Sequence, residues 1–343
     1  MKSLLKTCVA VAALTWGAGQ AWAAGELHIY NWGNYTNPEL IEKFEKAYDI
    51  KVTLDGYDSN ETMLAKVKPG GSGYDIVVPG DYMIAIMIKE GLLLESKPNE
   101  MENFENVDPL WTDVYWDPGR NYSVPWQWGT TSFTVNTEAY DGDIDTLAIL
   151  FDPPEALDGR INMLEDMNDV LNAGLRYLNY PRCNDNKEQL RDLAELLTNA
   201  KPHWRTMSYG TIEKLTSGDV DVSQNWNGAS MRARLQVPSL KYAYPKEGFT
   251  GWMDNVAILA DAPNPDNAKL FLNFIMDPEN AALISNFARY ANGIKGSEEF
   301  MDPEMLDAPE IIMPAGAPAP DFVPPCDEDV VAFYNKIWTN LKK

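Results

Sequence analysis

Histidine and cysteine are scarce in this chain of 343 residues, which holds two histidines and three cysteines. No paired zinc-ligand spacing is present. The chain has neither the G-x-S-x-G turn of a serine hydrolase nor the G-x-x-x-x-G-K loop that binds nucleotide phosphates. Residues 141–152 resemble a calcium loop, but Thr146 stands where that loop needs glycine. We therefore predict a protein that is not an enzyme and has no metal site and no cofactor.

Basic residues are also in short supply, because 28 Lys and Arg face 51 Asp and Glu and the formal charge is −23. A surface of this sign repels nucleic acid and anionic lipid headgroups and favours cationic partners. After residue 23, no apolar run approaches the roughly 20 residues that a membrane-spanning helix needs. We predict no nucleic-acid partner and no direct membrane insertion.

A short apolar run lies near the start of the chain. It follows Lys2 and Lys6 and precedes Ala-Trp-Ala at residues 21–23, which is the pattern of a cleavable secretory signal. We predict that residues 1–23 are a signal peptide and that the product is exported. Two cysteines remain beyond it, Cys183 and Cys326. They could pair in an oxidising compartment, but their wide separation in the sequence leaves that pairing open.

Strand-like and helix-like segments alternate along the remaining chain, which predicts an α/β fold with parallel sheets and right-handed crossovers. Its length exceeds what one hydrophobic core usually supports, so we expect two domains. The predicted strands are residues 26–32, 50–54, 74–78, 131–136, 160–164, 220–226 and a segment around 252. The predicted helices are residues 39–48, 59–68, 166–178, 186–199, 207–215, 266–276, 278–289 and 327–341.

Residues 249–259 form an apolar run that contains one tryptophan and one carboxylate. In an extended strand, Trp252 and Asp254 share one face and Met253 and Asn255 share the other. A ring face attracts an organic cation by about 0.5–2 kcal/mol, and a carboxylate gives it a charge-assisted hydrogen bond. A buried strand with a core tryptophan explains the same pattern, so both interpretations stay open at this point.

A second group of acids occupies residues 165–169, where a helix is predicted to begin near Asp166. A carboxylate in the first turn of a helix complements the helix dipole, so capping accounts for one of these acids. Asp166 and Asp169 lie three residues apart and can face the same cleft.

Several short segments occur in an order that resembles the periplasmic spermidine/putrescine-binding proteins of bacterial ABC importers. They span more than 200 residues and are 30–35 (YNWGNY), 59–63 (SNETM), 74–79 (YDIVVP), 226–228 (WNG), 245–248 (PKEG) and 252–254 (WMD). The resemblance implies a two-lobed periplasmic binding protein fold, with a mainly parallel sheet flanked by helices in each lobe and a ligand cleft at the hinge. It places residues 24–130 with 253–300 in lobe 1, and residues 131–252 with 301–343 in lobe 2.

The resemblance also implies a function, which is to capture a polyamine in the periplasm, as a monomer, and deliver it to an inner-membrane ABC permease. Acids would pair the ammonium groups, and aromatic rings would cover the methylenes. The implied rings are Trp32, Tyr35, Tyr82, Trp226, Trp252 and Tyr290, and the implied acids are Asp166, Asp169 and Asp254.

The chain departs from this family at one end of the expected site. Gly33 and Gly80 replace hydroxyl residues, and Asn34 stands where the family often has an acid. Asp81, beside Tyr82, is a candidate replacement for that acid, so Asn34 and Asp81 join the predicted ligand-binding residues. These differences leave the choice between spermidine, putrescine and another diamine open.

Two other functions are compatible with parts of the pattern. A secreted glycosidase could use Asp166 or Asp169 with Asp254 as its acid and base. A binding protein of the same fold could take a sugar or another small cation. A carboxylate ligand would need arginine, and no arginine lies in the ring-and-acid motifs.

Overall fold

The computed structural model describes residues 25–322 and 324–343, so the predicted signal peptide lies outside the described residues. The strands are β1 (Gly25–Trp32), β2 (Ile50–Tyr57), β3 (Ile76–Val77), β4 (Ser123–Asn136), β5 (Ile161–Met163), β6 (Trp204–Met207), β7 (Val222–Trp226), β8 (Leu240–Ala243), β9 (Thr250–Ile258) and β10 (Asp321–Phe322). The helices are α1 (Pro38–Tyr48), α2 (Asn60–Val67), α3 (Asp81–Lys89), α4 (Ala148–Phe151), α5 (Met167–Tyr177), α6 (Lys187–Ala200), α7 (Thr211–Thr216), α8 (Asn227–Arg234), α9 (Pro265–Ile275), α10 (Pro278–Ala288), α11 (Pro303–Leu306) and α12 (Glu328–Leu341).

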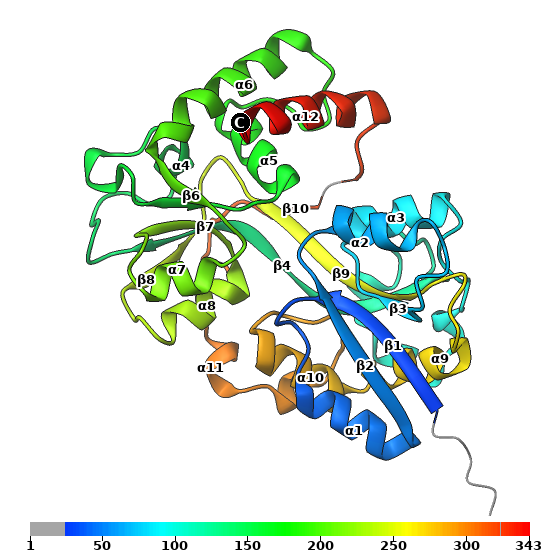
Figure 1. Cartoon of the computed structure of the whole chain (residues 1–343). Coiled ribbons are helices and arrows are strands. Elements are labelled where there is room, and N and C mark those ends of the chain that lie inside the picture. The colour runs from blue at the N-terminus through cyan, green and yellow to red at the C-terminus, as the bar shows by residue number, and fades with distance from the viewer. Residues whose placement is uncertain (1–24, 323) are drawn as a thin grey trace, which may run out of the picture.

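The strands form one sheet in the order β2-β1-β3-β9-β4-β7-β5-β6, with β10 paired to β9 and β8 paired to β4. Pairing is parallel among β1, β2 and β3 at one end and among β5, β6 and β7 at the other. In the middle, β9 and β4 run antiparallel to each other and to their outer neighbours. The predicted α/β fold with mainly parallel halves is confirmed, and β4 and β9 join these halves (Figure 1).

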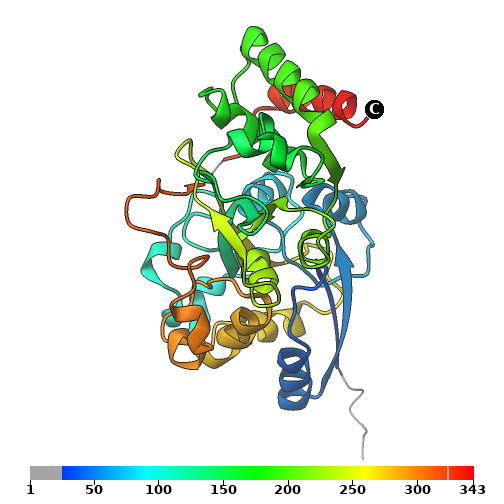
Figure 2. The same ribbon diagram turned by 90° about the vertical axis from the view of Figure 1, so that its left-hand side faces the viewer.

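Two hydrophobic cores lie on either side of this junction. The first packs β1, β3 and the later half of β9 against α1, α3, α9 and α10, and the second packs β5 and β7 against α5, α6 and α12. Strand β4 belongs to both, because Trp126 lies in the first core and Val135 in the second. Figure 2 shows from the side that α6 and α12 of the second core and α1 of the first lie at opposite ends of the molecule. The residue boundaries of the two lobes stay a prediction.

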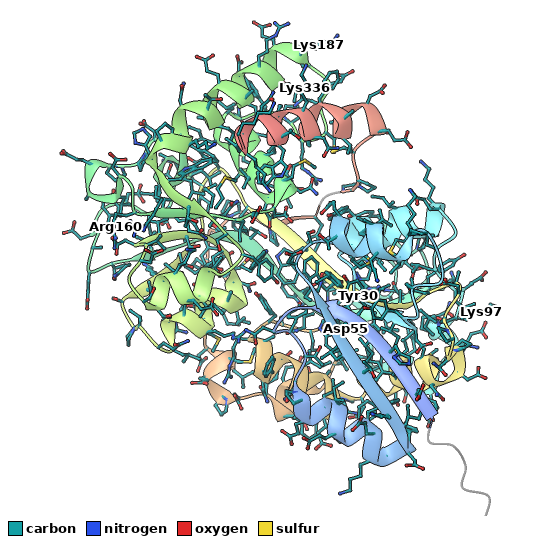
Figure 3. The ribbon with its side chains drawn as sticks, viewed as in Figure 1. Tyr30, Asp55, Lys97, Arg160, Lys187 and Lys336 are labelled. Atoms are coloured by element: carbon teal, nitrogen blue, oxygen red, sulfur yellow. A yellow bond between two sulfur atoms is a disulfide. The ribbon has the colours of Figure 1, made fainter. Side chains whose placement is uncertain are left out.

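The C-terminal segment returns to the second core, where Cys326 forms a disulfide with Cys183. This bond settles the pairing that the sequence left open. Before it, the segment is fixed by Glu310, whose buried carboxylate accepts hydrogen bonds of 2.6 and 2.8 Å from the Arg234 guanidinium. Figure 3 shows Lys187 and Lys336 at the end of the molecule formed by α6 and α12.

Several elements were not predicted from the sequence, among them α3, α8 and β6. Helix α3 begins at Asp81, shortly after the predicted strand at residues 74–78, and α8 begins at Asn227, directly after the predicted strand at residues 220–226. Strand β6 ends at Met207, where a helix was expected to begin. Helix α3 is apolar on nearly all sides, so its sequence lacks the amphipathic period on which the other predictions depend.

Candidate functional site

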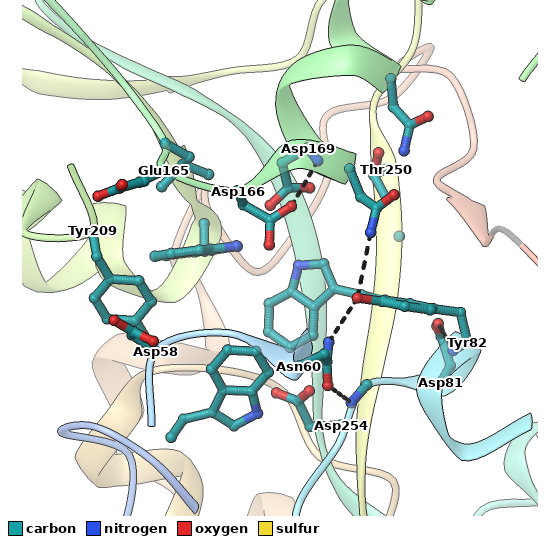
Figure 4. Close-up of a pocket in the computed structure, with 18 of the residues that line it drawn as sticks. Asp58, Asn60, Asp81, Tyr82, Glu165, Asp166, Asp169, Tyr209, Thr250 and Asp254 are labelled. Carbon is teal, nitrogen blue, oxygen red and sulfur yellow. Dashed lines mark hydrogen bonds between the residues drawn. The ribbon is translucent and has the colours of Figure 1, made fainter. Parts of the chain in front are cut away.

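A cavity of about 140 Å³ lies between the two cores. One water needs roughly 10–15 Å³ by this measure, so the cavity has room for a small molecule and not for a macromolecule. Helices and strands of both cores supply its walls (Figure 4). Ten of the eleven predicted residues line it: Trp32, Tyr35, Asp81, Tyr82, Asp166, Asp169, Trp226, Trp252, Asp254 and Tyr290.

Strand β9 supplies one wall through Trp252 and Asp254, both of which line the cavity. Met253 and Asn255 are fully buried on the opposite face. There the Asn255 side-chain oxygen accepts a 2.6 Å hydrogen bond from Arg120. The alternation predicted for this strand is therefore confirmed.

Aromatic rings, most of them packed against the first core, surround the cavity in edge-on and tilted pairs. The Trp252 ring meets the edge of Tyr290 at a centroid distance of 5.2 Å, and Trp32 lies 4.7 Å from Tyr57. The indole N–H of Trp32 donates to the Val78 carbonyl at 2.8 Å, which fixes the plane of that ring. Such walls offer π faces to a cation and exclude water from it.

Asp166 and Asp169 stand together at the start of α5. Asp166 caps the helix as predicted, because its Oδ1 accepts a 2.9 Å hydrogen bond from the Asp169 backbone N–H. Burial raises the pKa of Asp169 to about 8, and the neighbouring Asp166 charge contributes to this rise. Burial also raises the pKa of Asp166. Two close acids in a dry site favour holding a proton between them until a cation replaces it.

Asp254 lies across the cavity from that pair (Figure 4). Its side chain is nearly buried, and burial raises its pKa to about 8 although the neighbouring Tyr35 and Trp32 side chains lower it in part. Gly80 lies beside it, and a Cβ there would stand 3.2 Å from the Asn60 amide nitrogen and 3.7 Å from the Asp254 carboxylate. The missing hydroxyl at Gly80 thus leaves room that the Asn60 amide partly fills.

Asp81 and Asn34 are the two candidates at the end of the site where the chain departs from the family, and only Asp81 reaches the cavity. Asp81 lines the cavity, but its two oxygens accept backbone hydrogen bonds from Tyr82 at 2.6 Å and Met253 at 3.1 Å. Its carboxylate therefore ties α3 to β9. Asn34 is exposed, has a left-handed backbone with φ of 57°, and does not line the cavity. The turn after β1 accounts for asparagine there, because this residue tolerates that conformation.

Several cavity residues were not among the predicted ligand-binding residues: Asp58, Asn60, Glu165, Asn168, Asn172, Arg182 and Tyr209. Asn168 donates a 3.4 Å hydrogen bond to the Tyr82 hydroxyl, which joins the two cores across the cavity. Arg182 lies in none of the ring-and-acid motifs, yet the structure brings it into the cavity wall.

Neither a membrane span nor a metal cluster is present in the described part of the chain. None of its helices has the length and hydropathy to cross a bilayer. No group of three or more His, Cys, Asp or Glu side chains there could hold a metal ion.

Two α/β cores joined by β4 and β9, with a cavity of rings and acids between them, define a periplasmic binding protein fold. The chain belongs to the bacterial extracellular solute-binding protein family, whose profile matches residues 39–315. Membership of this family assigns it a binding role, in agreement with the prediction that it is not an enzyme.

Known relatives match this chain over most of its length. The putrescine-binding periplasmic protein SpuD of Pseudomonas aeruginosa is 34% identical over 85% of each chain. The spermidine/putrescine-binding periplasmic protein of Salmonella typhimurium is 32% identical over 90% of this chain and 89% of its own. A solved structure from Listeria monocytogenes, provisionally named a spermidine/putrescine ABC transporter, is 31% identical with a TM-score of 0.87 and covers 93% of this chain and 99% of its own.

Proposed function

We propose that this protein captures a polyamine in the cavity between its two cores and delivers it to an ABC permease. The observation that carries the proposal is the placement of Asp254 opposite Asp166 and Asp169, with tryptophan and tyrosine rings between them. A flexible chain with an ammonium group at each end matches this arrangement. Each ammonium pairs with acid, and the rings cover the methylenes.

The raised pKa values of the acids support the same function. Asp254 and Asp169, each with a pKa of about 8, are costly to ionise in a dry cavity without a counter-charge. A cation that enters the cavity supplies this counter-charge. A sugar would leave the acids without this counter-charge. It would also need hydrogen-bond donors, and a protonated carboxyl group donates only one hydrogen bond.

Export and transport complete the proposal. The predicted signal peptide and the word "periplasmic" in the names of two relatives support a periplasmic location. The predicted lobes, residues 24–130 with 253–300 and residues 131–252 with 301–343, then close about β4 and β9, and the closed monomer is the form that the permease binds. The relatives' names include both putrescine and spermidine, so they leave the identity of the amine open.

Calorimetric titration tests the proposal. The protein is unfolded, dialysed free of small molecules, refolded and titrated with putrescine, cadaverine and spermidine, with maltose and glutamate as controls. We expect a dissociation constant in the micromolar range or below for at least one amine, and no heat with either control. Heat with maltose alone, or no heat with any amine, would refute it.

A further inference from the structure

One guanidinium lines this acidic cavity. Arg182 lies in the loop between α5 and α6, and it is the one basic residue among the described residues that line the cavity. Six carboxyl residues line the same space. A fixed positive charge is unexpected in a site built for cations, so its position calls for a physical explanation.

Arg182 is held in place from three directions. Its Nε donates to the Asn172 side-chain oxygen on α5 at 3.0 Å, and its Nη2 donates to the Pro324 carbonyl at 3.4 Å. The next residue, Cys183, forms the disulfide with Cys326. The backbone N–H of Cys183 also donates to the Tyr334 hydroxyl on α12 at 3.1 Å. The guanidinium is thus fixed to α5 and the C-terminal segment, and the backbone that follows it is fixed to α12.

The hydrogen bonds of this guanidinium are incomplete. Nη1 is buried and has no hydrogen-bond partner among the described residues. Burial, and to a smaller extent the nearby Arg176 charge, lowers the pKa of Arg182 to about 10, so the group still carries its charge at neutral pH. The cavity wall therefore holds a desolvated positive charge.

When the positive charge of Arg182 is added to the charges of the cavity carboxylates, the net charge of the cavity matches that of a dication. Asp58 and Glu165 are exposed, and Glu165 pairs with Lys342 at 2.6 Å, so solvent and this lysine screen them. In the interior, the Arg182 charge acts on Asp81, where it opposes the rise in pKa that burial causes.

The acids that remain are Asp254 and the pair Asp166 and Asp169. The two members of the pair line the same cavity, and the charge of Asp166 adds to the burial that raises the pKa of Asp169, so one of them ionises more readily than both together. This leaves two net negative charges, one on each side of the cavity.

We infer that Arg182 is a specificity-determining residue that limits the cavity to short diamines, because the third ammonium of a triamine would have to share the cavity with a fixed guanidinium. This inference rests on the proposed function. It deepens that function by choosing the diamine class over the triamine class.

A comparison of putrescine and spermidine affinities tests this role. The variants are Arg182→Gln, which removes the charge, and Arg182→Lys, which keeps it. Arg205→Gln is the matched control, because this arginine is about half-exposed, pairs with Asp219 and does not line the cavity. We expect wild type, Arg182→Lys and Arg205→Gln to prefer putrescine by about tenfold or more. In Arg182→Gln we expect the preference to fall at least tenfold through tighter spermidine binding.

A ligand-side measurement keeps the test independent of folding defects in the variants. N1-acetylspermidine keeps the whole carbon–nitrogen chain of spermidine but carries two charges in place of three, so we expect it to bind wild type more tightly than spermidine does. Equal or weaker binding would overturn the inference, as would a wild-type preference for spermidine or an unchanged preference in Arg182→Gln. Binding of 4-aminobutyrate that is lost in Arg182→Gln would also overturn it, in favour of direct carboxylate recognition. If no amine binds wild type, the proposed function itself fails.

Discussion

Replacement of Asp254 by asparagine is the sharpest test of the site, because it removes one carboxylate and almost no volume. Asp254 is 8% exposed and lines the cavity beside Trp252. Loss of one partner from a buried ion pair costs about 3–5 kcal/mol. The wild-type carboxyl, however, has a pKa of about 8 and must lose its proton before it pairs with an ammonium. At pH 7 that step costs roughly 1.4 kcal/mol, which the asparagine variant avoids.

The expected net loss at pH 7 is therefore about 2–4 kcal/mol, or roughly 30- to 800-fold in the dissociation constant of the tightest amine. At pH 9 the avoided step no longer counts, so the loss should grow toward the full 3–5 kcal/mol. Calorimetric titration at both pH values measures this difference. Asp58→Asn is the matched control, because Asp58 lines the cavity mouth but is exposed, and we expect less than about 1 kcal/mol there. A loss below about tenfold for Asp254→Asn at both pH values would refute its role as an ammonium partner.

Three further predictions concern pH and stability. Burial raises the pKa of Asp169 and Asp254 to about 8, so their contribution to stability is complete below about pH 4 and is lost as the pH rises through 8. Amine affinity should then increase by up to about tenfold per pH unit for each displaced proton between pH 6 and 8, and calorimetry that finds a flat profile would contradict this. The double change Cys183→Ser and Cys326→Ser removes the disulfide between residues 143 positions apart and should lower the free energy of unfolding by about 3–5 kcal/mol. Urea titration measures this loss, and a loss under about 1 kcal/mol would contradict the prediction. Glu310→Gln breaks the pair with Arg234 and should cost about 2–4 kcal/mol of stability in the same assay, while calorimetry finds the amine affinity unchanged because Glu310 does not line the cavity.

Local patterns predicted much of this fold. Strands such as β1 and β9 were predicted because each contains an apolar run that is bounded by turn residues. Helices α6 and α12 were predicted because their apolar residues recur at helical spacing. Helix α3 was missed because Met and Ile cover most of its faces. The continuous sheet through β4 could not be predicted, because the pairing of β4 with β9 depends on residues more than a hundred positions apart.

The site was predictable where a ring and an acid are close in the sequence. Trp252 and Asp254 share a strand face, and Asp166 and Asp169 share a helix turn, so local geometry was sufficient. Arg182 had no such signal, because its place in the cavity depends on the C-terminal segment. The role of Asp81 was hidden for a related reason. Its partner at Met253 is a backbone N–H, which carries no sequence signature.

The position of β9 in the sheet also sets the order of events when the chain first folds. Strand β9 lies between β3 and β4, and its residue Ile258 pairs with Ile76. Until that residue has been synthesised, β3 has an unpaired edge and the first core lacks its central strand. The second core is completed later still, because it includes Tyr334 on α12. Neither core can therefore be completed before its last strand or helix has been synthesised, which is β9 or later for the first core and α12 for the second.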